Sequence, residues 1–181
     1  MATAEIYDPQ TDRWTQAAPM SRSRTGHAGC MLGDGRFAVY GGFGQPPAGS
    51  GTASHHLADC EVYYPKTDTW HCPLWKEGQE AAARGRIALM SPGAPVPVPA
   101  LVNNSGEGLP PMNYPRAFFA LERVGAHDVI AAGGKTSSPC QGVRTCEILD
   151  VEGRRWIPLP HGLRTPRAYL GSSVIHVAKN E

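Results

Sequence analysis

Three segments of the chain follow one pattern, and this internal repeat limits the fold more than any other feature. They are AEIYDPQTDRW (4–14), CEVYYPKTDTW (60–70) and CEILDVEGRRW (146–156). Each has Glu at its second position, Tyr or Leu at its fourth and Trp at its eleventh. A second pattern repeats as well: Gly41-Gly42 begins 17 residues after Arg24, and Gly133-Gly134 begins 17 residues after Arg116. Self-similarity at a fixed spacing is the signature of a repeat protein.

Each repeating unit reads as four short strands. In the second unit we expect strands at 27–32, 36–40, 61–64 and 69–74. Gly33-Asp34-Gly35 and the segment 65–68 have the composition of tight turns between antiparallel strands. Four antiparallel strands in about 50 residues are typical of one blade of a β-propeller. The sequence therefore predicts an all-β fold of four-stranded antiparallel blades.

The motif resembles the kelch repeat. That family has an Arg entering the first strand, Gly-Gly ending the second, Tyr-Asp-Pro closing the third and a Trp on the fourth. AEIYDPQTDRWTQAAPM together with the following RTGHAGCMLGDGRFAVYGG is similar to a kelch junction, whereas the third unit is looser, with Leu149 and Val151 in place of Tyr and Pro. The resemblance implies a kelch-type β-propeller segment, related to the central domain of galactose oxidase.

The repeats divide the chain into two whole blades and two half-blades. We expect the kelch-repeat region to span 1–181, as the end of a first blade (4–18), a second blade (19–75), a Pro/Gly-rich inserted loop (76–113), a third blade (114–160) and the start of a fourth (161–181). GAPVPVPAL in the inserted loop favours extended, polyproline-like chain, and 77–90 favours a short helix. We expect a piece of a six- or seven-bladed protein. The alternative is a half-propeller that pairs with another copy as a homodimer.

The repeated residues are expected to build the scaffold. The glycines permit positive φ and close backbone approach, and the large rings fill the space between blades. Arg24, Arg116 and Arg167 are expected to hydrogen bond from blade to blade. The structural kelch positions are Arg24, Gly41, Gly42, Tyr63, Trp70, Arg116, Gly133, Gly134 and Trp156.

Loops that could bind a partner are predicted on one face. In an up-and-down blade, the connection from strand two to three and the connection to the next blade emerge at the same end. The two long insertions, 43–58 and 76–113, are of these two kinds. Binding residues commonly lie on such loops, and kelch-like adaptors bind partners there. Arg and aromatic side chains favour protein contacts. The predicted contact residues are Arg22, His55, His56, Trp75, Arg84, Arg86, Tyr114, Arg144 and Arg164.

No catalytic constellation is recognised in the sequence. His55-His56 with Asp59-Cys60 lacks the paired spacing of a structural zinc site, so we expect no metal and no cofactor. We therefore predict a protein-interaction module, a substrate-recognition part of a larger adaptor, rather than an enzyme. The alternative is a fragment of a kelch-fold enzyme, either galactose-oxidase-like or sialic acid epimerase-like.

Composition limits the classes of partner that the protein can bind and indicates its cellular compartment. The net charge of +1 and the pI near 7.7 give no footprint for nucleic acid, and no apolar stretch is long enough to cross a membrane. The five cysteines are odd in number and irregularly spaced, as expected for free thiols in a reducing compartment. We expect a cytoplasmic protein whose partners are other proteins.

Overall fold

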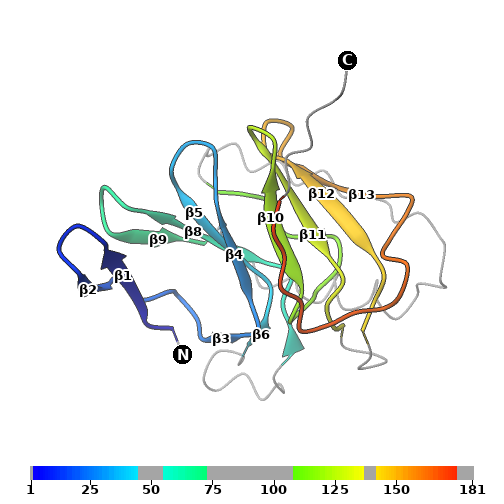
Figure 1. Cartoon of the computed structure of the whole chain (residues 1–181), viewed down its shortest axis with the longest axis horizontal. Helices are drawn as coiled ribbons and strands as arrows, with labels where there is room; N and C mark the ends of the chain where they lie inside the picture. Colours follow the sequence, from blue (N-terminus) through cyan, green and yellow to red (C-terminus); the bar gives the residue numbers. More distant parts are fainter. Residues whose placement is uncertain (1, 45–54, 73–107, 137–141, 175–181) are drawn as a thin grey trace.

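The computed structural model describes residues 2–44, 55–72, 108–136 and 142–174, and the regular elements in this part are all β-strands. Within these residues there is no helix that could span a membrane. The strands form two four-stranded sheets, one three-stranded sheet and one two-stranded sheet, all antiparallel (Figure 1). The prediction of an all-β fold of antiparallel blades is confirmed.

The two four-stranded sheets are the second and third blades. In each, the strands follow one another in chain order from one edge of the sheet to the other. The predicted strands of the second blade begin and end within two residues of the observed ones, apart from the end at 73–74, which lies outside the described residues. The second blade consists of β4 (Ala28–Met31), β5 (Phe37–Tyr40), β8 (Cys60–Tyr64) and β9 (Thr69–His71), and the third of β10 (Ala120–Val124), β11 (Asp128–Ala132), β12 (Cys146–Asp150) and β13 (Arg155–Pro158).

The first half-blade is a hairpin. It is formed by β1 (Ala4–Asp8) and β2 (Arg13–Ala17), and it repeats the outer two strands of each full blade. Tyr7 pairs with Trp14 across this hairpin, as Tyr63 pairs with Trp70 and Leu149 with Trp156. The sequence repeat is thus also a repeat of strand register.

A small sheet lies at one end of the second blade. It contains β3 (Arg24–Thr25), β6 (Phe43–Gly44) and β7 (His55–His56). The third blade has isolated bridges at the corresponding place, joining Ala117 to Lys135, Lys135 to Gly142 and Val143 to Arg167. In Figure 1 this end is at the bottom, and the β4–β5 and β10–β11 turns are at the top.

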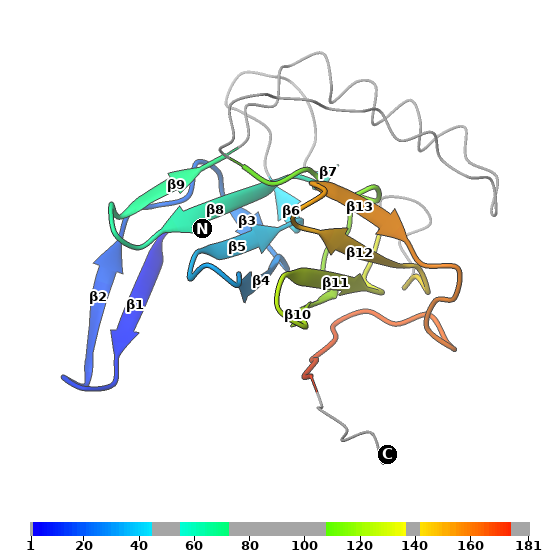
Figure 2. The same cartoon turned by 90° about the horizontal axis from the view of Figure 1, so that it is seen from above.

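The blades fan out from the inner strands, and the core lies between them. Seen from above, β4 and β10 lie close together while β9 and β13 are far apart (Figure 2). Tyr40 of the second blade meets Trp156 of the third edge to face, with ring centroids 5.2 Å apart. Both side chains are buried, so this pair fills the space between the blades.

Successive blades are joined by main-chain hydrogen bonds. Gly42 N donates to Arg116 O (2.9 Å), and Gly134 N donates to Arg167 O (2.8 Å). The glycine before each has φ near 65°, and a Cβ on Gly41 would lie 2.5 Å from Arg116 O. A side chain at Gly41 would therefore strain the backbone and collide with the next blade.

The expectation that the repeated arginines hydrogen bond from blade to blade is wrong for Arg24 and Arg116. Among the described residues, their guanidinium groups bind only partners in their own blade. Arg167 is exposed, and its backbone hydrogen bonds to Gly134 and Val143 of the third blade. The physical reason is that the main chain already makes the joint, which leaves the side chain to fix its own blade.

Part of the predicted inserted loop is described. Residues 108–113 lie against the second and third blades: Met112 N donates to Ala58 O, and Trp156 Nε1 donates to Pro110 O. Residues 73–107, which include the predicted helix, lie outside the described residues.

Candidate protein-interaction face

A buried ionic cluster in the second blade supports the end that carries β3, β6 and β7. The Arg24 guanidinium lies 2.8 Å from Asp59 Oδ1, 2.9 Å from Glu61 Oε1 and 3.0 Å from Gly41 O. Its side chain and that of Glu61 are fully buried. Ser21 N also donates to Glu61 Oε2, so the cluster fixes the chain that enters the blade.

The third blade repeats this cluster with one carboxylate fewer. Arg116 donates to Gly133 O (2.7 Å), Thr145 O (3.0 Å) and Glu147 Oε1 (2.9 Å), and Asn113 N donates to Glu147 Oε2. Thr145 takes the place of Asp59. Among the described buried side chains, Arg116 Nε is left without a hydrogen-bond partner.

Burial and neighbouring charges shift the pKa of one group in each cluster. Burial opposes the charged form of Arg24, but the carboxylates of Asp59 and Glu61 outweigh it and raise the pKa of that guanidinium. In the third blade, burial raises the pKa of the Glu147 carboxyl, and the nearby Arg116 guanidinium only partly offsets this. Buried pairs of this kind fix geometry because removing one partner strands a charge.

Three of the predicted contact residues carry positive charge at this end. Arg22 is half-buried, with Nη1 3.2 Å from Asp59 Oδ2. Arg144 is exposed, and its Nε donates to Leu163 O at 2.6 Å. That bond, with Leu163 N donating to Arg144 O, brings the exposed Arg164 next to Arg144 in the structure. Arg144 and Arg164 therefore form a cationic pair of positions on the third blade.

Two other predicted contact residues are packed against neighbouring side chains. His56 is buried on β7, with its ring edge to face against Phe43 at 5.3 Å. Tyr114 is half-buried, with the Arg116 guanidinium 5.7 Å from its ring centre, and desolvation raises its pKa. His56 therefore packs within the small sheet, and Tyr114 packs beside the buried cluster of the third blade. His55 is described only as part of strand β7, and Trp75, Arg84 and Arg86 lie outside the described residues.

The sequence reasoning missed an aromatic and cationic cluster at the same end. Tyr169 is 66% exposed, its ring lies 4.5 Å from that of Phe118, and Lys135 Nζ lies 3.0 Å from its hydroxyl. Phe118 and Tyr169 each follow a repeat Arg by two residues and have positive φ, like Gly26 in the second blade. The shared spacing of two residues after the repeat arginine was the sequence signal that could have identified Phe118 and Tyr169. Main-chain bonds from Phe118 N to Gly26 O and from Tyr169 N to Phe118 O align the three positions.

Three of the described thiols do not have the character of nucleophiles. Burial raises the pKa of Cys30 and Cys60 to about 12 and that of Cys72 to about 11. Such thiols stay protonated at neutral pH. Cys30, Cys60, Cys72 and Cys146 are free, and no three His, Cys, Asp or Glu side chains in the described part are grouped as metal ligands.

The fold and these repeated clusters define the class of protein: a segment of a β-propeller built from four-stranded blades. Comparison with known proteins then gives the type of repeat, because the Kelch motif model matches residues 1–21. The predicted resemblance to kelch-repeat proteins is confirmed.

The curated relatives are kelch-repeat proteins as well. An F-box/kelch-repeat protein of Arabidopsis thaliana is 35% identical over 91 residues, which are 49% of this chain and 21% of that protein. Kelch-like protein 34 of Homo sapiens is 41% identical over 70 residues, 39% of this chain and 10% of the relative. Kelch-like protein 1 of Mus musculus is 51% identical over 41 residues, 23% of this chain and 6% of the relative. The matched part spans about a fifth or less of each of these relatives.

Proposed function

We propose that the chain is a protein-interaction module whose face at the β3–β6–β7 end binds an acidic segment of a partner protein. The observation that supports this most strongly is that this end carries both the exposed Arg144 and Arg164 and the exposed Tyr169, whose hydroxyl is 3.0 Å from Lys135 Nζ. Arginine binds carboxylates in bidentate fashion, and Arg and Tyr are enriched among residues that dominate binding energy. A rigid base lowers the cost of ordering these side chains on binding.

The proposal assigns a binding role rather than a catalytic one. Three of the described thiols have raised pKa values that hold them protonated, which disfavours nucleophilic chemistry at these positions. We also propose that the module serves as the substrate-recognition part of a larger adaptor in the cytoplasm. The support is the name of one relative, an F-box/kelch-repeat protein, and the free state of the four described thiols.

The test is binding of paired synthetic peptides that share one length and differ in Asp/Glu or Lys content. We expect the acidic peptide to bind and the Arg144→Ala/Arg164→Ala double variant to bind it about tenfold or more weakly, as expected for the loss of hot-spot arginines. Arg123→Ala is the matched control, because Arg123 is an exposed arginine near the opposite end of the blade. Equal affinity for both peptides, or equal loss with the control variant, would refute the proposed face.

A further inference from the structure

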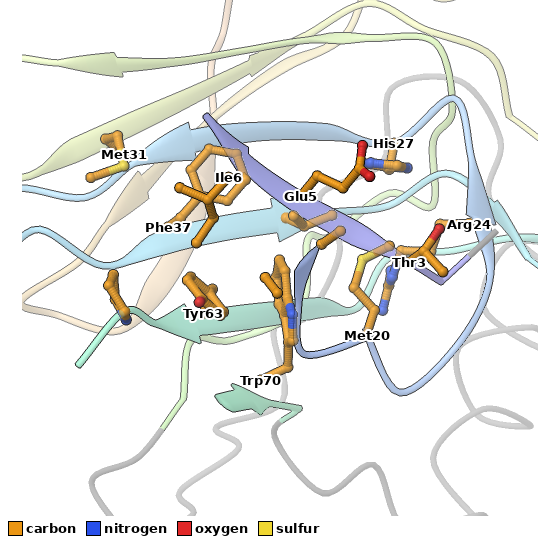
Figure 3. Close-up of a pocket in the computed structure, with 14 residues that line it drawn as sticks. Thr3, Glu5, Ile6, Met20, Arg24, His27, Met31, Phe37, Tyr63 and Trp70 are labelled. Atoms are coloured by element: carbon orange, nitrogen blue, oxygen red, sulfur yellow. The ribbon is translucent and has the colours of Figure 1, made fainter. Parts of the chain in front are cut away.

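The chain that enters the second blade is held by two side chains of that blade's outer hairpin. Asp68, in the β8–β9 turn, accepts the N–H of Ala18 at 2.8 Å, and Trp70 Nε1 donates to the carbonyl of Ala18 at 2.7 Å. Figure 3 shows the ring of Trp70 and Met20 of the entry chain at one pocket. Hydrogen bonds from the Ala18 N–H and the Tyr63 hydroxyl lower the pKa of the Asp68 carboxyl.

The third blade holds its own entry chain with a different side chain. Pro110 is the counterpart of Ala18, since each lies six residues before the repeat Arg, and Trp156 Nε1 donates to the Pro110 carbonyl at 3.1 Å. Proline has no N–H to offer. The turn position of Asp68 is occupied by Arg154, and its Nη2 donates to the carbonyl of Gly108 at 2.6 Å.

The two turns have the same backbone conformation, so the difference between them lies in the side chain. Asp68 has φ 49° and Arg154 has φ 50°. A carboxylate only accepts hydrogen bonds, and a guanidinium only donates them. An entry chain with a free N–H at this position therefore fits Asp. An entry chain with proline there offers carbonyl groups, and that of the buried Gly108 needs a donor.

The residue on the third strand changes together with the turn residue. In the first two units, the Tyr hydroxyl of the aligned pattern donates to the Asp of the turn at 2.7 Å. These pairs are Tyr7–Asp12 and Tyr63–Asp68. In the third unit Leu149 stands in place of Tyr, and Arg154 offers no acceptor for a hydroxyl. Three positions of the repeat thus differ in a mutually consistent way.

We propose that the residue at this turn determines which entry chain its blade accepts. Asp68 requires a main-chain N–H six residues before the repeat Arg, whereas Arg154 fits a proline there and binds the carbonyl two residues earlier. Because residues 108–110 belong to the predicted inserted loop, Arg154 is also a positioning residue. It fixes the place at which that loop meets the third blade.

The first experiment is a double-mutant cycle in each blade, with urea unfolding of the whole chain followed by circular dichroism. The second-blade pair is Ala18→Pro with Asp68→Arg, and the third-blade pair is Pro110→Ala with Arg154→Asp. We expect each single substitution to raise the equilibrium constant of unfolding. Each double variant should raise it at least about fivefold less than the product of its two singles, the coupling expected for a main-chain hydrogen bond that is lost and then replaced.

The third-blade pair keeps the test valid if Ala18→Pro prevents folding, because Pro110→Ala and Arg154→Asp only reduce the size of side chains. The control combines Ala18→Pro with Asp128→Arg, which reverses an exposed charge at the start of β11. These two substitutions should act independently. Losses without coupling in the third blade, or equal coupling with the Asp128 control, would overturn the proposed match between turn and entry chain.

Hydrogen exchange of the Met112 amide tests the positioning role of Arg154 separately. Met112 N donates to Ala58 O at 2.9 Å, close to the residues that Arg154 holds. We expect Arg154→Ala to speed the exchange of this amide severalfold, because the chain before it is no longer bound. Arg155→Ala is the matched control, since Arg155 is the next residue and its Nε lies 3.4 Å from Asp150. Unchanged exchange in Arg154→Ala, or equal acceleration by the control, would refute this role.

Discussion

A single buried arginine organises each full blade. Arg24 and Arg116 each reach the carbonyl of the first glycine of the Gly-Gly pair and a glutamate on the third strand. The glutamate in turn accepts a main-chain N–H from the residue three positions before the arginine. One ion pair thus ties together the entry chain, the second strand and the third strand, and it does so without any side chain from another blade.

The contribution of this ion pair to stability can be measured in the third blade. We predict that Glu147→Leu lowers the free energy of unfolding by about 3–5 kcal/mol, because it leaves the Arg116 charge buried and uncompensated. Replacing both partners, as Arg116→Met/Glu147→Leu, should cost less than Glu147→Leu alone, since no stranded charge remains. Urea unfolding followed by circular dichroism measures both. A double variant less stable than the single one would show that Arg116 acts chiefly through its carbonyl contacts.

At the scale of elements, the Gly-Gly pair ends the second strand where the next blade crosses it. Gly41 has φ 62°, and its Cα lies so close to Arg116 that an added Cβ would be 2.5 Å from the carbonyl oxygen. Gly35, in the β4–β5 turn, also has positive φ (85°), but nothing lies within 4 Å of its Cβ position. An alanine at Gly35 would therefore suffer only the strain of a positive φ. An alanine at Gly41 would suffer that strain and also collide with the next blade.

We predict that Gly35→Ala costs about 1–2 kcal/mol of unfolding free energy, the usual penalty for a left-handed alanine. Gly41→Ala should cost clearly more, because the carbonyl that it meets belongs to the main chain and cannot rotate away. Chemical unfolding of the two variants side by side is the measurement. Equal losses would show that only φ matters at Gly41.

The elements also show how far the sequence could predict the structure. Tyr-Trp and Gly-Gly spacing predicted the strands and their order, because both depend on local periodicity and turn chemistry. The side-chain partners were not predictable in the same way. Glu61 and Glu147 stood in the aligned repeat, but a spacing does not reveal which residue lies across the blade, and so Arg24 was assigned to the wrong neighbour.

The same limit applies to the candidate site. Arg22, Arg144 and Arg164 were predicted from their loops and lie at the expected end. His56 is predicted as a contact because it lies in the long insertion 43–58, yet in the structure it belongs to a two-residue strand and its ring packs against Phe43. Tyr169 was overlooked because its environment depends on Phe118 and Lys135, which come from other parts of the third blade.

At the scale of the whole molecule, stability depends on how well one blade covers the next. Trp156 is 2% exposed, meets Tyr40 across the interface and donates from Nε1 to Pro110 O. Trp14 holds the same repeat position in the first half-blade but is 66% exposed. The same residue is therefore a core residue or a surface residue, depending only on whether a blade lies against it.

We predict that Trp156→Ala lowers the free energy of unfolding by about 3–5 kcal/mol, the usual cost of deleting a buried large aromatic side chain. Ile157→Ala is the control, because Ile157 is the next residue on β13 and is 39% exposed. It should cost no more than about 1 kcal/mol, as expected for a largely exposed position. Guanidinium unfolding monitored by circular dichroism compares them, and similar losses would mean that the blade interface contributes little.

The main-chain joint between blades has an evolutionary consequence. The N–H groups of Gly42 and Gly134 donate to main-chain carbonyls, which every amino acid carries. The contact between blades therefore requires no particular side chain in the next blade. A unit that brings its own arginine and glutamate is complete internally and docks by its backbone. Such units can be duplicated, lost or exchanged between genes as cassettes, with the loops free to diverge while the connection remains the same.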